Sequence, residues 1–128
     1  LFCKSNLLNP FLKKDEFSFH SNILITANLP YVKKGDIANL WEDVNFEPKK
    51  AVFGWKITGF ETYERFFLMF FDFVSYFRPK KIFLICEIGF DQKEMAAEFL
   101  EKIWFKDYCF KKDTSWTERV LVVNWTIS

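Results

Sequence analysis

The chain has little of several features on which binding sites and membrane segments usually depend. Its formal net charge is only +1, so no surplus of basic residues indicates a nucleic-acid partner. The single histidine, His20, lies in a polar loop and has no metal-ligand residue types immediately beside it, which favours solvent exposure over metal binding. The longest apolar stretch, residues 66–77, is interrupted by Asp72 and Ser75 and is too short to span a bilayer. We therefore expect no direct nucleic-acid contact, no metal and no membrane partner.

Cysteine and glycine are also scarce. Cys3, Cys86 and Cys109 form no Cys-x-x-Cys pair, and their odd number cannot all pair. The sequence therefore predicts a reducing, cytoplasmic location and not a disulfide-stabilised secreted domain. The four glycines are scattered, and none belongs to the Gly-x-Gly-x-x-Gly spacing of a nucleotide-binding loop.

Hydrophobic residues, in contrast, are abundant. They make up 50% of the 128 residues, and 18 residues are Phe. This composition is typical of a globular chain, and the length allows one domain, residues 1–128, with a modest core.

Strand and helix patterns alternate along the chain and predict an α/β fold. Apolar runs rich in Ile and Leu predict strands at residues 22–27 and 81–88. Apolar residues at helical spacing predict helices at 60–77 and 92–102. The other predicted elements are a strand tail at 1–4, a loop with Asn9-Pro10, a loop at 51–59, a short helix within 33–45 capped by Asp36, and strands at 105–111 and 119–125 around a turn at 113–117. This order favours a mostly parallel sheet with an antiparallel hairpin at one edge.

The strand at 22–27 runs into the tetrapeptide Asn28-Leu29-Pro30-Tyr31. Ligands of open α/β sheets bind outside the carboxyl ends of the strands, which is where this polar corner lies. The tetrapeptide resembles the (Asn/Asp/Ser)-Pro-Pro-(Tyr/Phe) signature of methyltransferases that alkylate planar nitrogens of amides and adenines, with Leu29 in place of the first proline. The alternative is that Asn28 is a turn residue at a strand end, because Asn tolerates unusual dihedral angles.

Four further segments, in order, resemble the HemK/PrmC family of release-factor glutamine methyltransferases. They are FEPKKAVFG at 46–54, like the family's (F/Y)EPxxALFGG; GFETYER at 59–65, like DGLxxYR; EIGFDQ at 87–92, like EIGxxQ; and ERV at 118–120, like (D/E)RV. The resemblance implies the Rossmann-like fold of class I methyltransferases. An rRNA adenine dimethylase can share the tetrapeptide, but Glu47-Pro48 and Glu87-Ile88-Gly89 argue against one.

This resemblance implies that the tetrapeptide is catalytic and binds the substrate. Asn28 would supply a side-chain acceptor and Leu29 a backbone acceptor for a glutamine NH₂ group. Pro30 would fix the backbone of the turn, and Tyr31 would form one side of the pocket for the planar amide. The implied protein substrate is a peptide chain release factor, methylated at N5 of the glutamine in its Gly-Gly-Gln motif. Glu87, on a buried strand, is expected to be an internal hydrogen-bonding anchor and not a catalytic base.

The implied cofactor is S-adenosyl-L-methionine, bound by Asn6, Leu7 and Asn28. Asn6 and Leu7 belong to Ser5–Leu8, which resembles the family's SDLL with Asn6 in place of the acidic residue. The family's Gly-rich cofactor loop and its substrate-recognition domain lie upstream of anything present here. We therefore expect the chain to be the C-terminal part of one methyltransferase domain, inactive alone and monomeric at full length. Two alternatives stay open: an enzyme directed at adenine N6 or another amino group, and a non-catalytic methyltransferase-like remnant.

Three tryptophans, Trp55, Trp104 and Trp116, stand where the family pattern has glycine. A helix ending near Ile103 would place Trp104 in a left-handed conformation, which glycine adopts freely and tryptophan only at a cost of about 1 kcal/mol or more. The frequent Phe, Lys, Ile and Asn residues indicate an AT-rich coding sequence. One hypothesis is that these residues are glycines encoded by UGA codons that the source organism reads as glycine; the alternative is independent substitution.

Overall fold

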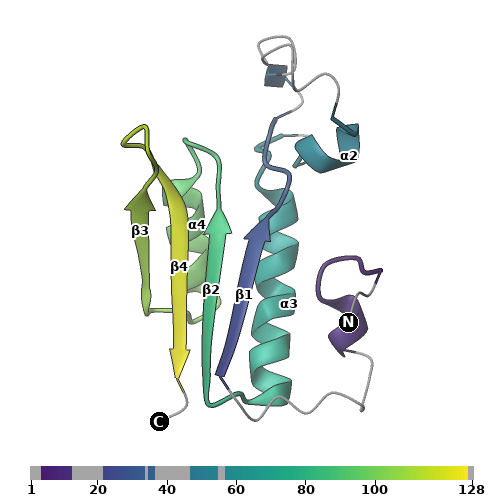
Figure 1. Cartoon of the computed structure of the whole chain (residues 1–128), viewed down its shortest axis with the longest axis vertical. Helices are drawn as coiled ribbons and strands as arrows, with labels where there is room; N and C mark the ends of the chain where they lie inside the picture. The colour runs from purple at the N-terminus through teal and green to yellow at the C-terminus, as the bar shows by residue number, and fades with distance from the viewer. Residues whose placement is uncertain (1–3, 13–21, 34, 37–46, 55–56, 127–128) are drawn as a thin grey trace.

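The computed structural model describes residues 4–12, 22–33, 35–36, 47–54 and 57–126. The described elements form one sheet with helices packed behind it (Figure 1). In chain order they are α1 (Asn9–Leu12), β1 (Asn22–Asn28), α2 (Lys49–Val52), α3 (Glu61–Phe77), β2 (Lys81–Glu87), α4 (Lys93–Lys102), β3 (Tyr108–Lys112) and β4 (Glu118–Thr126).

The four strands form a mixed sheet in the order β1-β2-β4-β3. β1 runs parallel to β2, whereas β4 is antiparallel to both β2 and β3. The predicted α/β class and the antiparallel hairpin at one edge are confirmed. Three of the strands, β1, β2 and β3, run in one direction and β4 runs in the other, so the sheet is mixed. Only one of its three strand pairs is parallel, because β4 returns through a tight turn from β3 and inserts next to β2.

α3 connects the two parallel strands and supplies most of the core. Its apolar residues recur at helical spacing, so one face is buried; the buried residues are Tyr63, Phe66, Phe67, Phe70, Phe73 and Val74. The helix ends at Arg78, whose φ of 45° is left-handed and whose backbone N–H donates to the Val74 carbonyl at 2.9 Å, and Pro79 follows. None of the described helices combines the length and apolarity needed to cross a bilayer.

Only one face of the sheet is covered by described helices. Figure 1 shows α3 and α4 on the same side of the sheet, and alternate residues of β2 are fully buried beneath them. The residues between them point to the opposite face, where Leu24 of β1 is 63% exposed. We call this second surface the open face; its residues are Leu24, Thr26, Phe83, Ile85 and Val122.

Several predicted boundaries differ from the structure. The predicted loop with Asn9-Pro10 is the start of α1, in whose first turn Pro10 is tolerated because the N–H it lacks would have no helical partner. The predicted loop at 51–59 begins inside α2. The strand predicted at 105–111 starts only at Tyr108. Most of the predicted strand tail at 1–4 and of the predicted helix within 33–45 lies outside the described residues.

Candidate functional site

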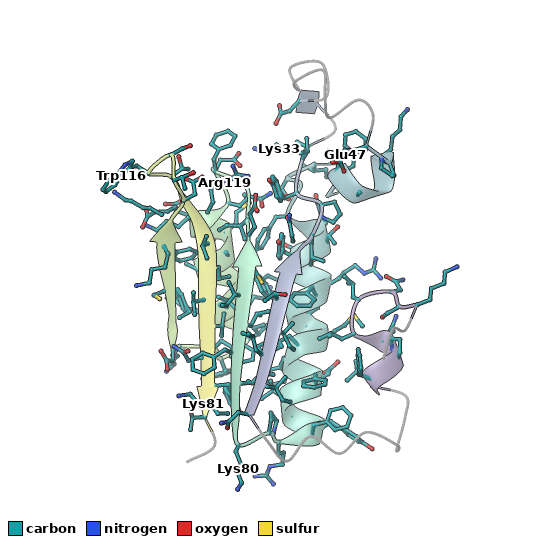
Figure 2. The ribbon with its side chains drawn as sticks, viewed as in Figure 1. Lys33, Glu47, Lys80, Lys81, Trp116 and Arg119 are labelled. Atoms are coloured by element: carbon teal, nitrogen blue, oxygen red, sulfur yellow. The ribbon has the colours of Figure 1, made fainter. Side chains whose placement is uncertain are left out.

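The candidate site lies at the edge of the sheet where β1 and β2 both end. Because these strands are parallel, their carboxyl ends meet, and Asn28 is the register partner of Glu87. β4 is antiparallel, so its first residues reach the same edge, with Val120 opposite Glu87. In Figure 2, Arg119 and Lys33 are labelled at this edge, while Lys80 and Lys81 mark the opposite edge.

The side chain of Tyr31 joins the tetrapeptide to β2 and β4. Its hydroxyl donates to Glu87 Oε1 at 2.9 Å and accepts a hydrogen bond from Arg119 Nη2. Arg119 Nη2 also lies 2.8 Å from Glu87 Oε1, and the guanidinium carbon lies 5.5 Å from the Tyr31 ring centroid. Burial, followed by the hydrogen bond to Glu87, raises the pKa of Tyr31, although the Arg119 charge opposes this shift. Tyr31 is therefore a neutral phenol at neutral pH, held by a carboxylate on one side and a cation on the other.

The ion pair in this network contributes more to position than to stability. The Arg119 and Glu87 side chains are 29% and 41% exposed. Solvent screens a pair of this kind, which typically stabilises a fold by about 1 kcal/mol or less. Arg119 is itself placed by the Ile88 carbonyl, 3.4 Å from its Nε, and by Asp113, 3.9 Å from its Nη1.

Tyr63 of α3 forms hydrogen bonds that fix the backbone of the tetrapeptide. The Leu29 N–H donates to the Tyr63 hydroxyl at 3.2 Å, and that hydroxyl donates to the Glu87 carbonyl. Burial raises the pKa of Tyr63 well above its ordinary value, so this hydroxyl keeps its proton. Tyr63 thus joins the carboxyl ends of the two parallel strands.

A buried glutamine holds the other end of the tetrapeptide. Gln92 is fully buried, and its Nε2 donates to the carbonyls of Tyr31 at 3.1 Å and Thr58 at 3.4 Å. Its Oε1 accepts from the Gly89 N–H at 2.9 Å. Gln92 therefore connects three loops at the carboxyl edge of the sheet.

Two glycines allow the chain to pass close behind the tetrapeptide. Gly59 has a φ of 74°, and a Cβ there would lie 2.2 Å from the Tyr31 carbonyl oxygen. A Cβ on Gly54 would lie 1.9 Å from the Gly59 oxygen and 2.6 Å from the Pro30 oxygen. Both contacts are with backbone, so no side-chain movement could relieve them. The segment after α2 therefore needs glycine at both positions to support the site.

The structure brings together the predicted substrate residues but not the predicted cofactor residues. Asn28 is exposed at the end of β1, and among the described residues its side chain makes no hydrogen bond, so its amide can accept one from a ligand. Leu29, Pro30 and Tyr31 follow it and are half-buried.

Asn6 and Leu7 lie in the turn before α1. The Asn6 carbonyl accepts from the Asn9 N–H within that turn at 3.3 Å, and Figure 1 shows this segment beside α3, apart from the loop that follows β1. The cofactor role of Asn6 and Leu7 remains a prediction.

Sequence reasoning found some of the supporting residues and missed others. The expected role of Glu87 as a hydrogen-bonding anchor is confirmed by its bonds to Tyr31 and Arg119. The roles of Arg119, Tyr63 and Gln92 were not predicted. One usable signal was present: Arg119 is one of only three arginines in a lysine-rich chain, and arginine is the residue suited to planar hydrogen bonding with carboxylates.

The described part of the chain offers no group of three or more His, Cys, Asp or Glu side chains that could hold a metal ion. Lys33 and Asp91 form an ion pair beside the tetrapeptide. Compared with models of known protein families, the chain matches none.

Proposed function

We propose that this chain is part of an S-adenosyl-L-methionine-dependent methyltransferase of the HemK/PrmC type, which methylates the side-chain amide of a glutamine in a peptide chain release factor. The observation that carries the proposal is the exposed Asn28 at the carboxyl end of β1, followed by Leu29-Pro30-Tyr31, whose backbone and ring are held in place. A turn with no function beyond reversing the chain would not need three separate anchors.

The chemistry explains why a rigid pair of acceptors is useful. The lone pair of an amide nitrogen is delocalised into the carbonyl group, so a free glutamine side chain is a poor nucleophile. In the proposed arrangement, the Asn28 side-chain oxygen and the Leu29 carbonyl accept the two N–H bonds of the substrate amide. Both are neutral acceptors, so they orient the NH₂ group without forming a charged pair with it. The contribution to the rate is orientation and proximity, with no covalent enzyme intermediate.

Tyr31 forms a wall for the planar amide in this proposal, and Glu87 and Arg119 keep the ring in one orientation. Since both hydrogen-bonding capacities of the Tyr31 hydroxyl are used by these two residues, the phenol is not available as a base. The methyl group comes from the sulfonium of the bound cofactor. The departing amide proton passes to solvent, because Glu87, the register partner of Asn28, is already bound by Arg119 and Tyr31.

The residues described here supply the substrate side of such a site more completely than the cofactor side. Asn28 is available as a polar contact, whereas the turn containing Asn6 and Leu7 leads into α1, which lies beside α3 and apart from the loop that follows β1 (Figure 1). None of the four glycines belongs to a Gly-x-Gly-x-x-Gly spacing. We therefore expect residues 1–128 alone to bind S-adenosyl-L-methionine very weakly and to transfer no methyl group.

The test is Asn28→Ala in the complete gene product, assayed for methylation of a release factor by mass spectrometry of its Gly-Gly-Gln peptide. Loss of the side-chain acceptor should lower the rate by about a hundredfold or more, because one contact that orients the amide is removed. Asn28→Asp keeps an acceptor oxygen and should retain more activity than the alanine variant.

Thr26→Ala is the matched control, since Thr26 lies two residues earlier on the same face of β1 and is also exposed. It should methylate at the wild-type rate. Near-normal methylation by Asn28→Ala would contradict the proposed role of the tetrapeptide. Methylation of an adenine-containing oligonucleotide, but not of the release factor, would instead support the adenine-directed alternative, in which the tetrapeptide orients an adenine amino group.

A further inference from the structure

Two exposed tryptophans have a backbone conformation that favours glycine. Trp104 has a φ of 69° and Trp116 a φ of 62°. Their side chains are 73% and 79% exposed, so neither indole ring fills space in the core. The left-handed region brings the Cβ of an L-residue close to the following carbonyl, which only glycine avoids entirely.

Trp104 occupies the position after a helix end where glycine is most often found. Past the end of α4, the Phe105 N–H donates to the Leu100 carbonyl at 2.9 Å and the Trp104 N–H donates to the Glu101 carbonyl at 3.1 Å. This pair of bonds defines a Schellman motif with Trp104 as its left-handed residue. Phe105 is buried directly after it, so the turn is fixed by the core and cannot relax to suit tryptophan.

Trp116 occupies the equivalent position of a hairpin turn. Between β3 and β4, the Trp116 N–H donates to the Asp113 carbonyl at 3.1 Å, and the Asp113 N–H donates to the Thr117 carbonyl at 2.8 Å. Asp113 Oδ1 accepts from the N–H groups of Ser115 and Thr117. A turn of this kind ends in a left-handed residue that forms a β-bulge, and glycine is preferred there.

The tryptophan side chains offer little compensation for this strain. The Trp116 ring lies 5.4 Å from Lys112 Nζ, but a cation–π contact at an exposed site is weak. Two other non-glycine residues, Leu7 and Arg78, also have a left-handed backbone conformation. Trp125, the third described tryptophan, differs in both respects: it lies in β4 and packs edge-on against Phe105 at 5.4 Å. Among the three described tryptophans, the left-handed conformation is therefore confined to the two that contribute nothing to the core.

From these turns we infer that residues 104 and 116 are glycines in the protein made by the source cell, each encoded by a UGA codon that this cell reads as glycine. Translation of the same UGA codons with a genetic code in which UGA encodes tryptophan would then give the tryptophans of the sequence. The inference agrees with the composition, since only four of 128 residues are Gly, less than half of the ~7% that is usual. Trp55 lies outside the described residues, and Trp125 is excluded by its packing.

The decisive measurement combines the gene with the natural protein. UGA codons at both positions, together with peptides from the source organism whose masses require glycine at 104 and 116, are the expected result. A UGG codon at either position, or a natural peptide carrying tryptophan there, would overturn the inference.

A second measurement tests its structural basis in the recombinant 128-residue chain. The folding equilibrium constant of Trp104→Gly should be about 5- to 30-fold higher than that of Trp104→Ala, and the same difference is expected between Trp116→Gly and Trp116→Ala. Alanine lacks the indole ring but keeps the Cβ that is strained in the left-handed conformation. At position 125, the matched control, the glycine variant should have a lower folding equilibrium constant than the alanine variant. Equal stability of the glycine and alanine variants would show that the turns do not require glycine, and would count against the inference.

Discussion

At the scale of single residues, Gln92 is predicted to stabilise the fold through its hydrogen bonds. It is the one buried polar side chain in the described part of the chain, and its amide satisfies three backbone groups, those of Gly89, Tyr31 and Thr58. Gln92→Leu keeps a similar volume but leaves these groups without a partner, and each unsatisfied buried group costs about 1–3 kcal/mol. We expect urea unfolding to give a loss of at least about 2 kcal/mol.

Asp91→Asn provides the control for this substitution. Asp91 is adjacent in sequence but exposed, and its ion pair with Lys33 is open to solvent. Its removal should change the free energy of unfolding by less than about 1 kcal/mol. If Gln92→Leu and wild type unfold at the same urea concentration, the described hydrogen bonds of Gln92 do not hold the loops together.

Stability should also depend on pH in the alkaline range. Burial raises the pKa of the Cys86 thiol above its ordinary 9.0, and burial raises those of Tyr63 and Tyr31 above 10.0. Above these ordinary values the unfolded chain loses protons that the folded chain keeps. The stabilisation is therefore complete below about pH 9 and is lost as the pH rises further, by up to about 1.4 kcal/mol per pH unit for each group.

Urea unfolding at a series of pH values between about 8 and 11 would measure this loss. Cys86→Ala should remove the part that begins near pH 9 and leave the part that begins near pH 10, as expected from the ordinary values of the thiol and the phenols. A free energy of unfolding that stays constant over this range would contradict the prediction.

Among the secondary-structure elements, α3 should respond very differently to substitution on its two faces. Phe70 is fully buried and stacks on Phe105 at a centroid distance of 5.2 Å, whereas Leu68 is about half exposed. Phe70→Ala should cost about 3–5 kcal/mol, because it removes a large buried side chain and leaves a cavity. Leu68→Ala should cost less than about 1 kcal/mol. Chemical denaturation checks both values, and similar losses would mean that the helix packs on a different face.

The elements best predicted from the sequence are those with long local patterns. The helical spacing of residues 60–77 and the apolar run of 81–88 predicted α3 and β2 to within one residue at each end, because burial of one face imposes a period on the sequence. The insertion of β4 next to β2 was not predictable in this way, since strand order depends on packing between distant segments. The start of β3 was also misplaced, because Phe105 is buried but belongs to the turn after α4.

The same distinction applies to the candidate site. The tetrapeptide 28–31 was recognisable because its four residues are contiguous. The bonds from Gln92 and Arg119 to Tyr31 join residues that are 61 and 88 positions apart. No local pattern encodes such contacts, so their roles emerged only from the fold.

For the whole molecule, the open face is the feature most relevant to behaviour in solution. Leu24 is 63% exposed, and Phe83 and Ile85 lie beside it on β2. Among the described residues, β1 has one strand neighbour and its other edge carries none. Apolar surface next to an unpaired strand edge favours association. We expect the isolated 128-residue chain to self-associate with increasing concentration, as measured by sedimentation velocity.

Leu24→Lys should weaken this association, because it places a charge on the apolar surface next to the unpaired edge of β1. Leu68→Lys is the control on the opposite side of the molecule, where α3 faces solvent, and it should leave the association unchanged. An equal effect of both substitutions, or a chain that stays monomeric at all concentrations, would exclude the open face as the contact surface.

The left-handed turns at 104 and 116 also bear on which proteins the proposed methyltransferase could modify. A codon that inserts glycine cannot also end translation, so a cell that reads UGA as glycine has no use for a release factor that recognises UGA. Taken with the proposed function, this leaves only release factors that recognise the remaining stop codons, UAA and UAG, as substrates. Two surface turns with a φ near 65° would thereby narrow the range of release factors that the proposed site could take as substrates.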